Sequence, residues 1–320
     1  MRTIRLGRTN VNVPAVSLGT WGHGGPNKSG DIPVGWTGHD DGLASDALRL
    51  AWRRGITHWD AADVYGDGNA EELIGGVWDE VPRKEIFLAT KVGWDAGDYG
   101  HFYHPDQIRL RIERSLRNLR TDVIDLYYFH HCDFGPEDIY LDDALETFHE
   151  LRAEGKFRFL GLSDWDNSKV ARLAPRIDPD VVQPFRNVVD DTYESSGLKS
   201  WVEANDAGAA FFSPLKHGLL LGKYDRPAVF GEGDFRSRIA EFGDQHALDR
   251  LRERKDQLEK HFPDQPQPLL HALLGVLLED SPSGCVLLGQ RRPEQVEAAA
   301  VAGEVLSRKD AEFVRAVYGS

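Results

Sequence analysis

The strongest constraint on the fold is a regular alternation of short apolar runs with stretches of helical periodicity along almost the whole chain. Such alternation is typical of parallel βα units. Eight apolar runs have the length of β-strands, at residues 15–19, 57–60, 86–91, 123–130, 157–163, 181–183, 209–212 and 285–289. Helical stretches follow them at residues 45–54, 70–78, 105–119, 141–153, 169–173, 198–204, 269–278 and 293–301. Eight strands alternating with eight helices predict a closed (β/α)8 TIM barrel of the α/β class.

A β-hairpin is predicted ahead of the barrel. Ile4 and Leu6 alternate with polar residues, residues 7–10 have turn composition, and Val11 and Val13 resume the alternation. We expect this hairpin to form a small cap on the main body.

Two segments depart from the alternation and predict long loops. Residues 22–41 and 222–268 are rich in glycine and charge, and each follows a predicted strand. In a barrel, such loops lie at the carboxyl ends of the strands, where barrel enzymes keep their active sites. Further helical stretches occupy residues 246–261 and 308–317. No stretch has the composition of an interdomain linker, so residues 1–320 are predicted to form a single domain.

The composition limits the classes of partner. Of the 320 residues, 41% are hydrophobic and 28% are charged, as in folded globular proteins. The 38 Lys and Arg against 52 Asp and Glu give a net charge of −14, which repels nucleic-acid phosphates and anionic lipid. Two cysteines are too few for a disulfide framework, and no apolar run reaches the roughly 20 residues of a membrane span. We expect a protein of the reducing cytoplasm that acts on a small molecule and binds neither nucleic acid nor membrane.

Ionisable residues stand at or just after the ends of three successive predicted strands. Asp60 ends the second strand, Tyr65 follows it in the loop, Lys91 ends the third strand and His130 ends the fourth. A tyrosine phenol titrates near pH 10, so a general acid of this type needs a nearby cation to stabilise its phenolate, and Lys91 is placed to supply it. Asp60 could hold that lysine, and a neutral His130 could donate a hydrogen bond to a carbonyl oxygen. This set suits protonation of an oxyanion.

A metal site is the alternative for the histidines. His130, His131 and Asp133 form a His-His-x-Asp cluster that could suggest metal ligands. Neighbouring residues of a strand point to opposite faces, which disfavours joint binding of one ion. We expect no metal.

Three stretches resemble the aldo-keto reductase family. Residues 55–66, GITHWDAADVYG, look like its signature around a catalytic Asp and Tyr, with Ala61 where threonine is usual. Residues 89–93, ATKVG, match the strand of the catalytic lysine. Residues 124–130, IDLYYFH, match the strand of the catalytic histidine, which selects His130 over His131. The resemblance implies reversible hydride transfer at a carbonyl, with the Tyr as general acid and the Asp, Lys and His beside it.

The same resemblance implies a nicotinamide dinucleotide held across the barrel mouth without a Rossmann domain. The sequence agrees, because Gly22, Gly24 and Gly25 lack both the spacing of a GxGxxG motif and a helix directly after it. The predicted cofactor contacts near the first two strands are Gly19, Thr20, Trp21 and Asp60.

The nicotinamide end of the cofactor is assigned by resemblance to the ends of three later strands. Residues 155–164 are similar to the family's strand ending in Ser-Asn, so Ser163 and Gln183 would grip the carboxamide. Asp164 replaces the Asn, and a carboxylate accepts from the amide but cannot donate to its oxygen. Phe212 falls where an aromatic ring stacks on the nicotinamide.

The phosphate end is assigned to two loops. Residues 213–223 look like the family's pyrophosphate loop, and Arg236 looks like a further phosphate contact. Residues 289–295 lead into a helix, whose amino terminus suits an anion. Their arginine pair favours NADP(H) over NAD(H), although Ala298 and Ala299 stand where many members have Glu-Asn. The residues assigned here are Ser213, Leu215, Gly218, Lys223, Arg236, Gly289, Arg291, Arg292 and Gln295.

The substrate is predicted to be a small carbonyl or alcohol compound bound among aromatic side chains. Aromatic walls suit sugars and aryl aldehydes equally, so the sequence leaves the substrate open. The predicted pocket residues are Trp21, Tyr65, Trp94, His130 and His131, with Trp36 in the same loop region.

Two other functions are weighed against the reductase. A cofactor-sensing module, like the barrel subunits that accompany potassium channels, would keep the same residues, but the sequence shows no extra docking segment. A metal-dependent barrel isomerase or hydrolase would need ligands that converge on an ion, and Lys91 in the middle of the set disfavours it.

Overall fold

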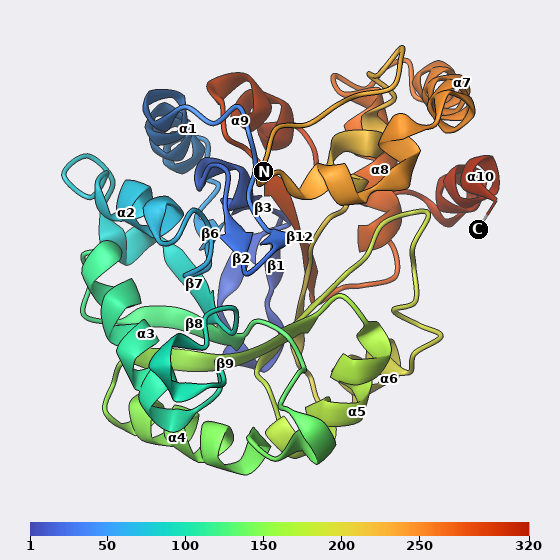
Figure 1. Ribbon diagram of the computed structural model, residues 1–320. Helices are drawn as coiled ribbons and strands as arrows, with labels where there is room; N and C mark the ends of the chain where they lie inside the picture. The colour runs from blue at the N-terminus through green and yellow to red at the C-terminus, as the bar shows by residue number, and fades with distance from the viewer. Residues whose placement is uncertain (320) are drawn as a thin grey trace.

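The chain folds into a closed barrel of eight parallel strands (Figure 1). The computed structural model describes residues 1–319. The barrel strands are β3 (Val16–Gly19), β6 (His58–Asp60), β7 (Phe87–Val92), β8 (Ile124–Phe129), β9 (Phe157–Asp164), β10 (Val181–Pro184), β11 (Gly208–Phe211) and β12 (Gly284–Gly289). They pair in chain order, and β12 pairs with β3 to close the sheet. The predicted TIM barrel is confirmed, and each predicted strand overlaps one of these.

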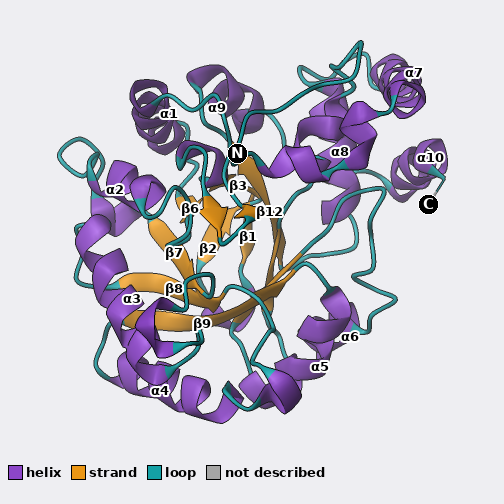
Figure 2. Cartoon of the chain, in the orientation of Figure 1, coloured by secondary structure: helices purple, strands orange, loops and turns teal. Residues whose placement is uncertain are grey.

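Helices surround the barrel, as the ring of purple ribbons in Figure 2 shows. Each helix overlaps a predicted helical stretch. Their bounds are α1 (Asp41–Arg53), α2 (Asn69–Gly75), α3 (Pro105–Asn118), α4 (Leu141–Ala153), α5 (Asn167–Ile177), α6 (Leu198–Ala204), α7 (Gln245–His261), α8 (Pro268–Leu278), α9 (Pro293–Ala300) and α10 (Arg308–Tyr318).

Two of these helices extend four residues beyond one end of the predicted stretches. The side chain of Asp40 accepts a hydrogen bond from Leu43 N at 2.9 Å, so α1 begins several residues earlier than its apolar pattern indicates. Helix α5 continues past Pro175 to Ile177, because Ile177 completes its buried face.

The strand register brings the predicted site residues to one end of the barrel. Gly19 pairs with both Asp60 and Gly289, and Gln183 pairs with Ser163. Lys91 pairs with Tyr128, two residues before His130. Parallel strands in this register place their carboxyl ends together, and this end is called the mouth below.

The predicted hairpin forms and lies against the opposite end of the barrel. Strands β1 (Thr3–Arg5) and β2 (Asn12–Pro14) pair antiparallel and lie in front of the barrel in Figure 1. At Gly7, with φ of +49°, a Cβ atom would lie 2.2 Å from the carbonyl carbon of Ala207, just before β11. Only glycine therefore fits this close approach.

The two long loops meet across the mouth. The first runs from β3 to α1 and includes the short pair β4 (Lys28–Ser29) and β5 (Ile32–Pro33). The second follows β11 and reaches α7. They are joined where Phe235 N donates to Gly35 O at 3.0 Å and Thr37 Oγ1 donates to Asp234 Oδ2 at 2.6 Å. Both loops follow barrel strands at the mouth, as expected.

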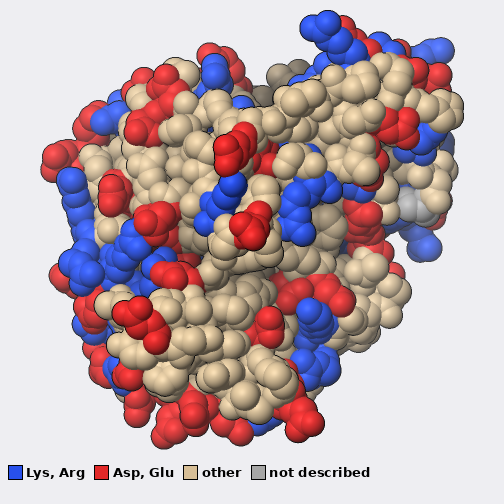
Figure 3. Space-filling view, in the orientation of Figure 1, with Lys and Arg blue, Asp and Glu red and all other residues tan. Residues whose placement is uncertain are grey.

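Charged residues of both signs are interspersed on the face that Figure 3 shows, which is the face of the hairpin. Within residues 1–319, no helix is both long enough and apolar enough to cross a membrane.

A buried arginine ties the end of β10 to the end of α8. The side chain of Arg186 is 2% exposed and binds Asp280 Oδ2 at 2.8 Å and Asp191 Oδ2 at 2.9 Å. Its guanidinium also lies over the rings of Tyr193 and Phe211, at 4.9 and 4.8 Å from their centroids. It therefore holds together three segments that are distant in sequence.

Replacing Arg186 with Met should lower the free energy of unfolding by about 3 kcal/mol, because two carboxylates lose their buried partner. Urea unfolding followed by circular dichroism would measure this change. The control is Arg308→Met, whose ion pair with Glu312 is exposed and should contribute less than about 0.5 kcal/mol. Equal losses in both variants would contradict the role given to Arg186.

Candidate active site

Lys91 joins Asp60 and Tyr65 at the mouth. Its side chain is fully buried, and its Nζ donates to Asp60 Oδ1 at 2.5 Å and to Ala61 O at 2.7 Å. The third donor bond runs to the hydroxyl of Tyr65 at 3.3 Å. Gln183 Nε2 donates to the other Asp60 oxygen at 2.8 Å. The carboxylate thus fixes the ammonium against the phenol, as the sequence predicts.

Burial dominates the electrostatics of this group. It raises the pKa of Asp60 and lowers the pKa of Lys91, while their mutual contact opposes both shifts. Burial, together with the carboxylates of Asp60 and Asp63, holds the pKa of Tyr65 well above its usual value. Tyr65 therefore keeps its proton at neutral pH. The lysine contact is available to the phenol oxygen when that proton leaves.

His130 follows β8 and faces Tyr65. The two rings are perpendicular, with centroids 5.9 Å apart. Burial and the charge of Lys91 hold the pKa of His130 well below its usual value, so the imidazole is neutral. Its Nδ1 atom has no hydrogen-bond partner among residues 1–319.

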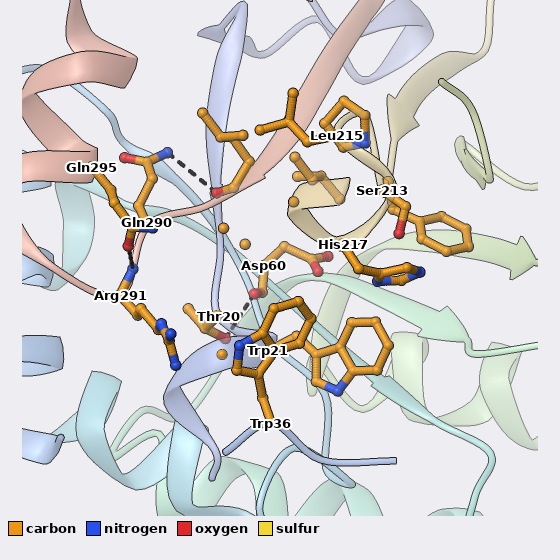
Figure 4. Close-up of a pocket in the computed structure, with 18 of the residues that line it drawn as sticks. Thr20, Trp21, Trp36, Asp60, Ser213, Leu215, His217, Gln290, Arg291 and Gln295 are labelled. Atoms are coloured by element: carbon orange, nitrogen blue, oxygen red, sulfur yellow. Dashed lines mark hydrogen bonds between the residues drawn. The ribbon is translucent and has the colours of Figure 1, made fainter. Parts of the chain in front are cut away.

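Two cavities meet at the mouth. The larger, with about 980 Å³ of empty space that includes open solvent, has Asp60 and Tyr65 in its lining. The smaller, with about 470 Å³ counted in the same way, has Tyr65 and His130. Figure 4 shows residues that line the larger cavity, with Arg291 and Gln295 on one side of Asp60 and Ser213 and His217 on the other. Both cavities are lined by Trp21, Tyr65, Gln183 and Phe212. Tyr65 therefore lies where the larger cavity and the smaller one join.

Three cations line the larger cavity. Arg236 binds Asp234 at 2.6 Å and lies between the rings of Trp36 and Phe230, each 4.3 Å away. Arg291 Nη1 donates to the carbonyl oxygens of residues 37 and 38, at 3.0 Å each. Lys223 makes no ion pair within residues 1–319, and burial and the neighbouring arginines lower its pKa. This cluster carries net positive charge, which fits the phosphates of a dinucleotide.

At the other end of this cavity, the predicted nicotinamide contacts are largely in place. Phe212 and Gln183 line both cavities, and Ser163 lines the smaller one. Ser163 Oγ donates to Gln183 O at 2.9 Å. An aromatic face beside amide and hydroxyl groups fits a nicotinamide ring and its carboxamide.

The mouth brings most of the predicted site residues together, but four of them, Lys91, His131, Asp164 and Arg292, line neither cavity. The carboxylate of Asp164 accepts from the backbone N–H of Cys132 at 2.7 Å and of Asp166 at 2.8 Å, so it is engaged by the chain itself. Arg292 is exposed at the start of α9, and His131 Nε2 is hydrogen-bonded to Gly93 O. The remaining predicted cofactor contacts on the larger cavity are Gly19, Thr20, Ser213, Leu215, Gly218, Gly289 and Gln295.

Other lining residues were not predicted. Trp165 and Phe235 line the smaller cavity with Val34 and Val64, and His217 lines the larger one. Trp36 lines the larger cavity rather than the smaller one. Trp165 is the second residue after the predicted strand 157–163, and this position is the signal that could have found it. Phe235 lies deep in a long loop, whose path the sequence pattern does not define.

Within the described chain, no cluster of three or more His, Cys, Asp and Glu side chains is arranged to hold a metal ion.

A barrel with a lysine-supported tyrosine at the junction of an elongated cationic cavity and a small aromatic one has the arrangement of a nicotinamide-dependent oxidoreductase. The model of the aldo/keto reductase family matches residues 15–318, and the chain belongs to this family.

Relatives cover nearly the whole chain. Aldo-keto reductase YhdN of Bacillus subtilis is 27% identical over 99% of this chain and 93% of its own length. The NADH-specific methylglyoxal reductase of Escherichia coli is 29% identical over 98% of each chain. Among solved structures, a glycerol dehydrogenase from Gluconobacter oxydans is similar with a TM-score of 0.80 and 27% identity, over 98% of this chain and 94% of that one. The predicted family is confirmed.

Proposed function

We propose that this protein is an NADP(H)-dependent reductase that interconverts small aldehydes or ketones with their alcohols. The observation that carries this proposal is the position of Tyr65, which lines both a cavity suited to a dinucleotide and a small cavity suited to a carbonyl compound. Lys91 lies beneath that hydroxyl and is itself held by Asp60.

The residues of the mouth have separate roles in carbonyl reduction. When bound, the reduced nicotinamide supplies the hydride. Tyr65 donates its proton to the carbonyl oxygen, and Lys91 stabilises the phenolate that remains. Neutral His130 donates a hydrogen bond to the same oxygen and so orients and polarises the carbonyl. In the reverse direction the phenolate accepts the proton of the alcohol.

The cations at one end of the larger cavity support NADP(H) as the cofactor. Arg291 projects beside the start of α9, where a 2′-phosphate would gain both a guanidinium and a helix amino terminus. The methylglyoxal reductase of Escherichia coli is NADH-specific, whereas aldo-keto reductase yakc of Schizosaccharomyces pombe is named for NADP(+), so the family includes both preferences. Ala299 is buried in α9 and Ala298 is small, so neither offers a polar contact to the adenosine.

Titration with NADPH and NADH, followed by tryptophan fluorescence, tests this proposal. Trp21 and Trp36 line the larger cavity, so bound nicotinamide should quench their emission. We expect NADPH to bind at least about 10-fold more tightly than NADH, because a charge-assisted hydrogen bond contributes 1.5–3 kcal/mol. Arg291→Ala should remove most of this preference, whereas the neighbouring Arg292→Ala should change it less.

Other results would overturn either the cofactor preference or the reductase activity itself. Equal binding of the two cofactors would remove the NADP(H) assignment and leave a reductase. Absence of binding by either cofactor would remove the reductase itself. Tight binding without turnover of any carbonyl compound would favour the cofactor-sensing alternative.

A further inference from the structure

The smaller cavity, which under the proposed function holds the substrate, is walled by side chains without charge. Its lining consists of Trp21, Val34, Val64, Tyr65, Trp94, His130, Ser163, Trp165, Gln183, Phe212 and Phe235. His130 is neutral, for the reasons given above. Resting on the proposed function, we infer that this site selects uncharged carbonyl compounds and rejects anionic ones of the same size and shape.

The polar groups of the cavity are concentrated at the reacting end or are already engaged. Tyr65 and His130 face the carbonyl. Ser163 donates to Gln183 O, and Gln183 donates to Asp60. The indole N–H of Trp21 donates to Val34 O at 2.7 Å. Away from the reacting end, the uncommitted donors are the neutral indoles of Trp94 and Trp165, so a carboxylate or phosphate would find no cation there.

Aromatic rings form one part of the cavity wall. Trp165 stacks on Phe235, with centroids 5.2 Å apart and an interplanar angle of 16°, and meets Phe212 edge-on at 4.9 Å. Phe235 is held in place by the hydrogen bond between its N–H and Gly35 O. These rings carry no formal charge, so this wall offers an anion no ion pair in exchange for its lost hydration.

Lys91 contacts the Tyr65 hydroxyl at the reacting end, but neither it nor the other nearby cations line this cavity. Arg236 is paired with Asp234 and lines the larger cavity only. Exposed Arg238 lies 5.5 Å from the ring centroid of Phe235 but does not line the smaller cavity. An anionic substituent would therefore lose its hydration in the cavity without gaining an ion pair, which is costly.

The test compares aldehydes that differ in charge but hardly in shape. Benzaldehyde, 4-nitrobenzaldehyde, methyl 4-formylbenzoate and 4-formylbenzoate would be reduced with NADPH at pH 7, and kcat/KM measured for each. The nitro group is a neutral isostere of the carboxylate, and the ester is larger but neutral. We expect the three neutral aldehydes to fall within about 10-fold of one another and the carboxylate to be at least about 100-fold poorer.

A cation introduced into the wall provides the matched variant. Trp165 is partly exposed, so Trp165→Arg can keep its charge in contact with water. It should improve kcat/KM for 4-formylbenzoate relative to the ester by at least about 10-fold, whereas Trp165→Leu should leave that ratio nearly unchanged.

The outcomes separate this inference from the proposed function. A carboxylate reduced as well as its ester would overturn the inference and leave the reductase intact. If 4-formylbenzoate were reduced efficiently and this activity were lost in Arg238→Ala, the inference would also be overturned, since Arg238 would then bind the carboxylate. Failure of all four aldehydes with NADPH bound would remove both proposals.

Discussion

Replacing Tyr65 with Phe should lower kcat for carbonyl reduction about 1,000-fold, because a general acid contributes 10²–10⁴-fold to such a step. NADPH affinity should change less than about threefold, since the substitution removes one hydrogen bond from Lys91 and none of the cations of the larger cavity. The ring itself stacks on Trp21 with centroids 6.0 Å apart, and Phe preserves that contact. Steady-state kinetics and fluorescence titration of the same preparation would measure the two effects.

Tyr127 offers the matched control for this variant. It is a buried tyrosine on β8 whose hydroxyl has no partner among residues 1–319, and its ring stacks on Phe148 rather than lining a cavity. Tyr127→Phe should keep kcat within about twofold. If Tyr65→Phe retained more than a tenth of the wild-type kcat, another group would have to be the proton donor.

The site residues at the strand ends could be predicted from the sequence, because the register of parallel strands determines which residues meet at the carboxyl end of the barrel. Once eight parallel strands close, residues such as Asp60 and Lys91 must come to the same edge, whatever the loops do. The family resemblance then distinguished His130 from His131, and the structure places only the former on the smaller cavity.

The loop contributions could not be predicted in the same way. Phe235 reaches the smaller cavity because Asp234 and Gly35 join two loops about 200 residues apart in sequence, and no local periodicity encodes such a contact. The family resemblance predicts Asp164 as a cofactor contact, because it replaces the Asn of the family's strand. Whether a carboxylate faces a ligand or the chain's own amides depends on the turn that follows it, here with Cys132 and Asp166 as donors.

The Asp60–Lys91 pair is where function and stability are most closely coupled. Lys91→Met should lower kcat by about 1,000-fold, because the Tyr65 phenolate loses its cation. It should also lower the free energy of unfolding by about 3 kcal/mol near neutral pH, because it leaves the carboxylate of Asp60 buried without a counter-ion.

The stability loss in Lys91→Met should depend on pH with a definite sign. Burial raises the pKa of Asp60 above its ordinary value of 3.8, and removal of Lys91 removes the main opposing interaction. The folded variant therefore binds a proton that the unfolded chain releases above about pH 4, so its stability relative to wild type falls as pH rises from there. Urea unfolding at pH 5 and pH 8 would show the larger deficit at pH 8.

A double variant separates the two effects. Asp60→Asn combined with Lys91→Met removes both charges, so it should recover much of the lost stability and lose its pH dependence, while kcat stays low because the phenolate still lacks its cation. Recovery of kcat together with stability would mean that Lys91 acts only by holding the fold. A deficit in Lys91→Met that did not grow with pH would mean that Asp60 is not left charged and buried when its partner is removed.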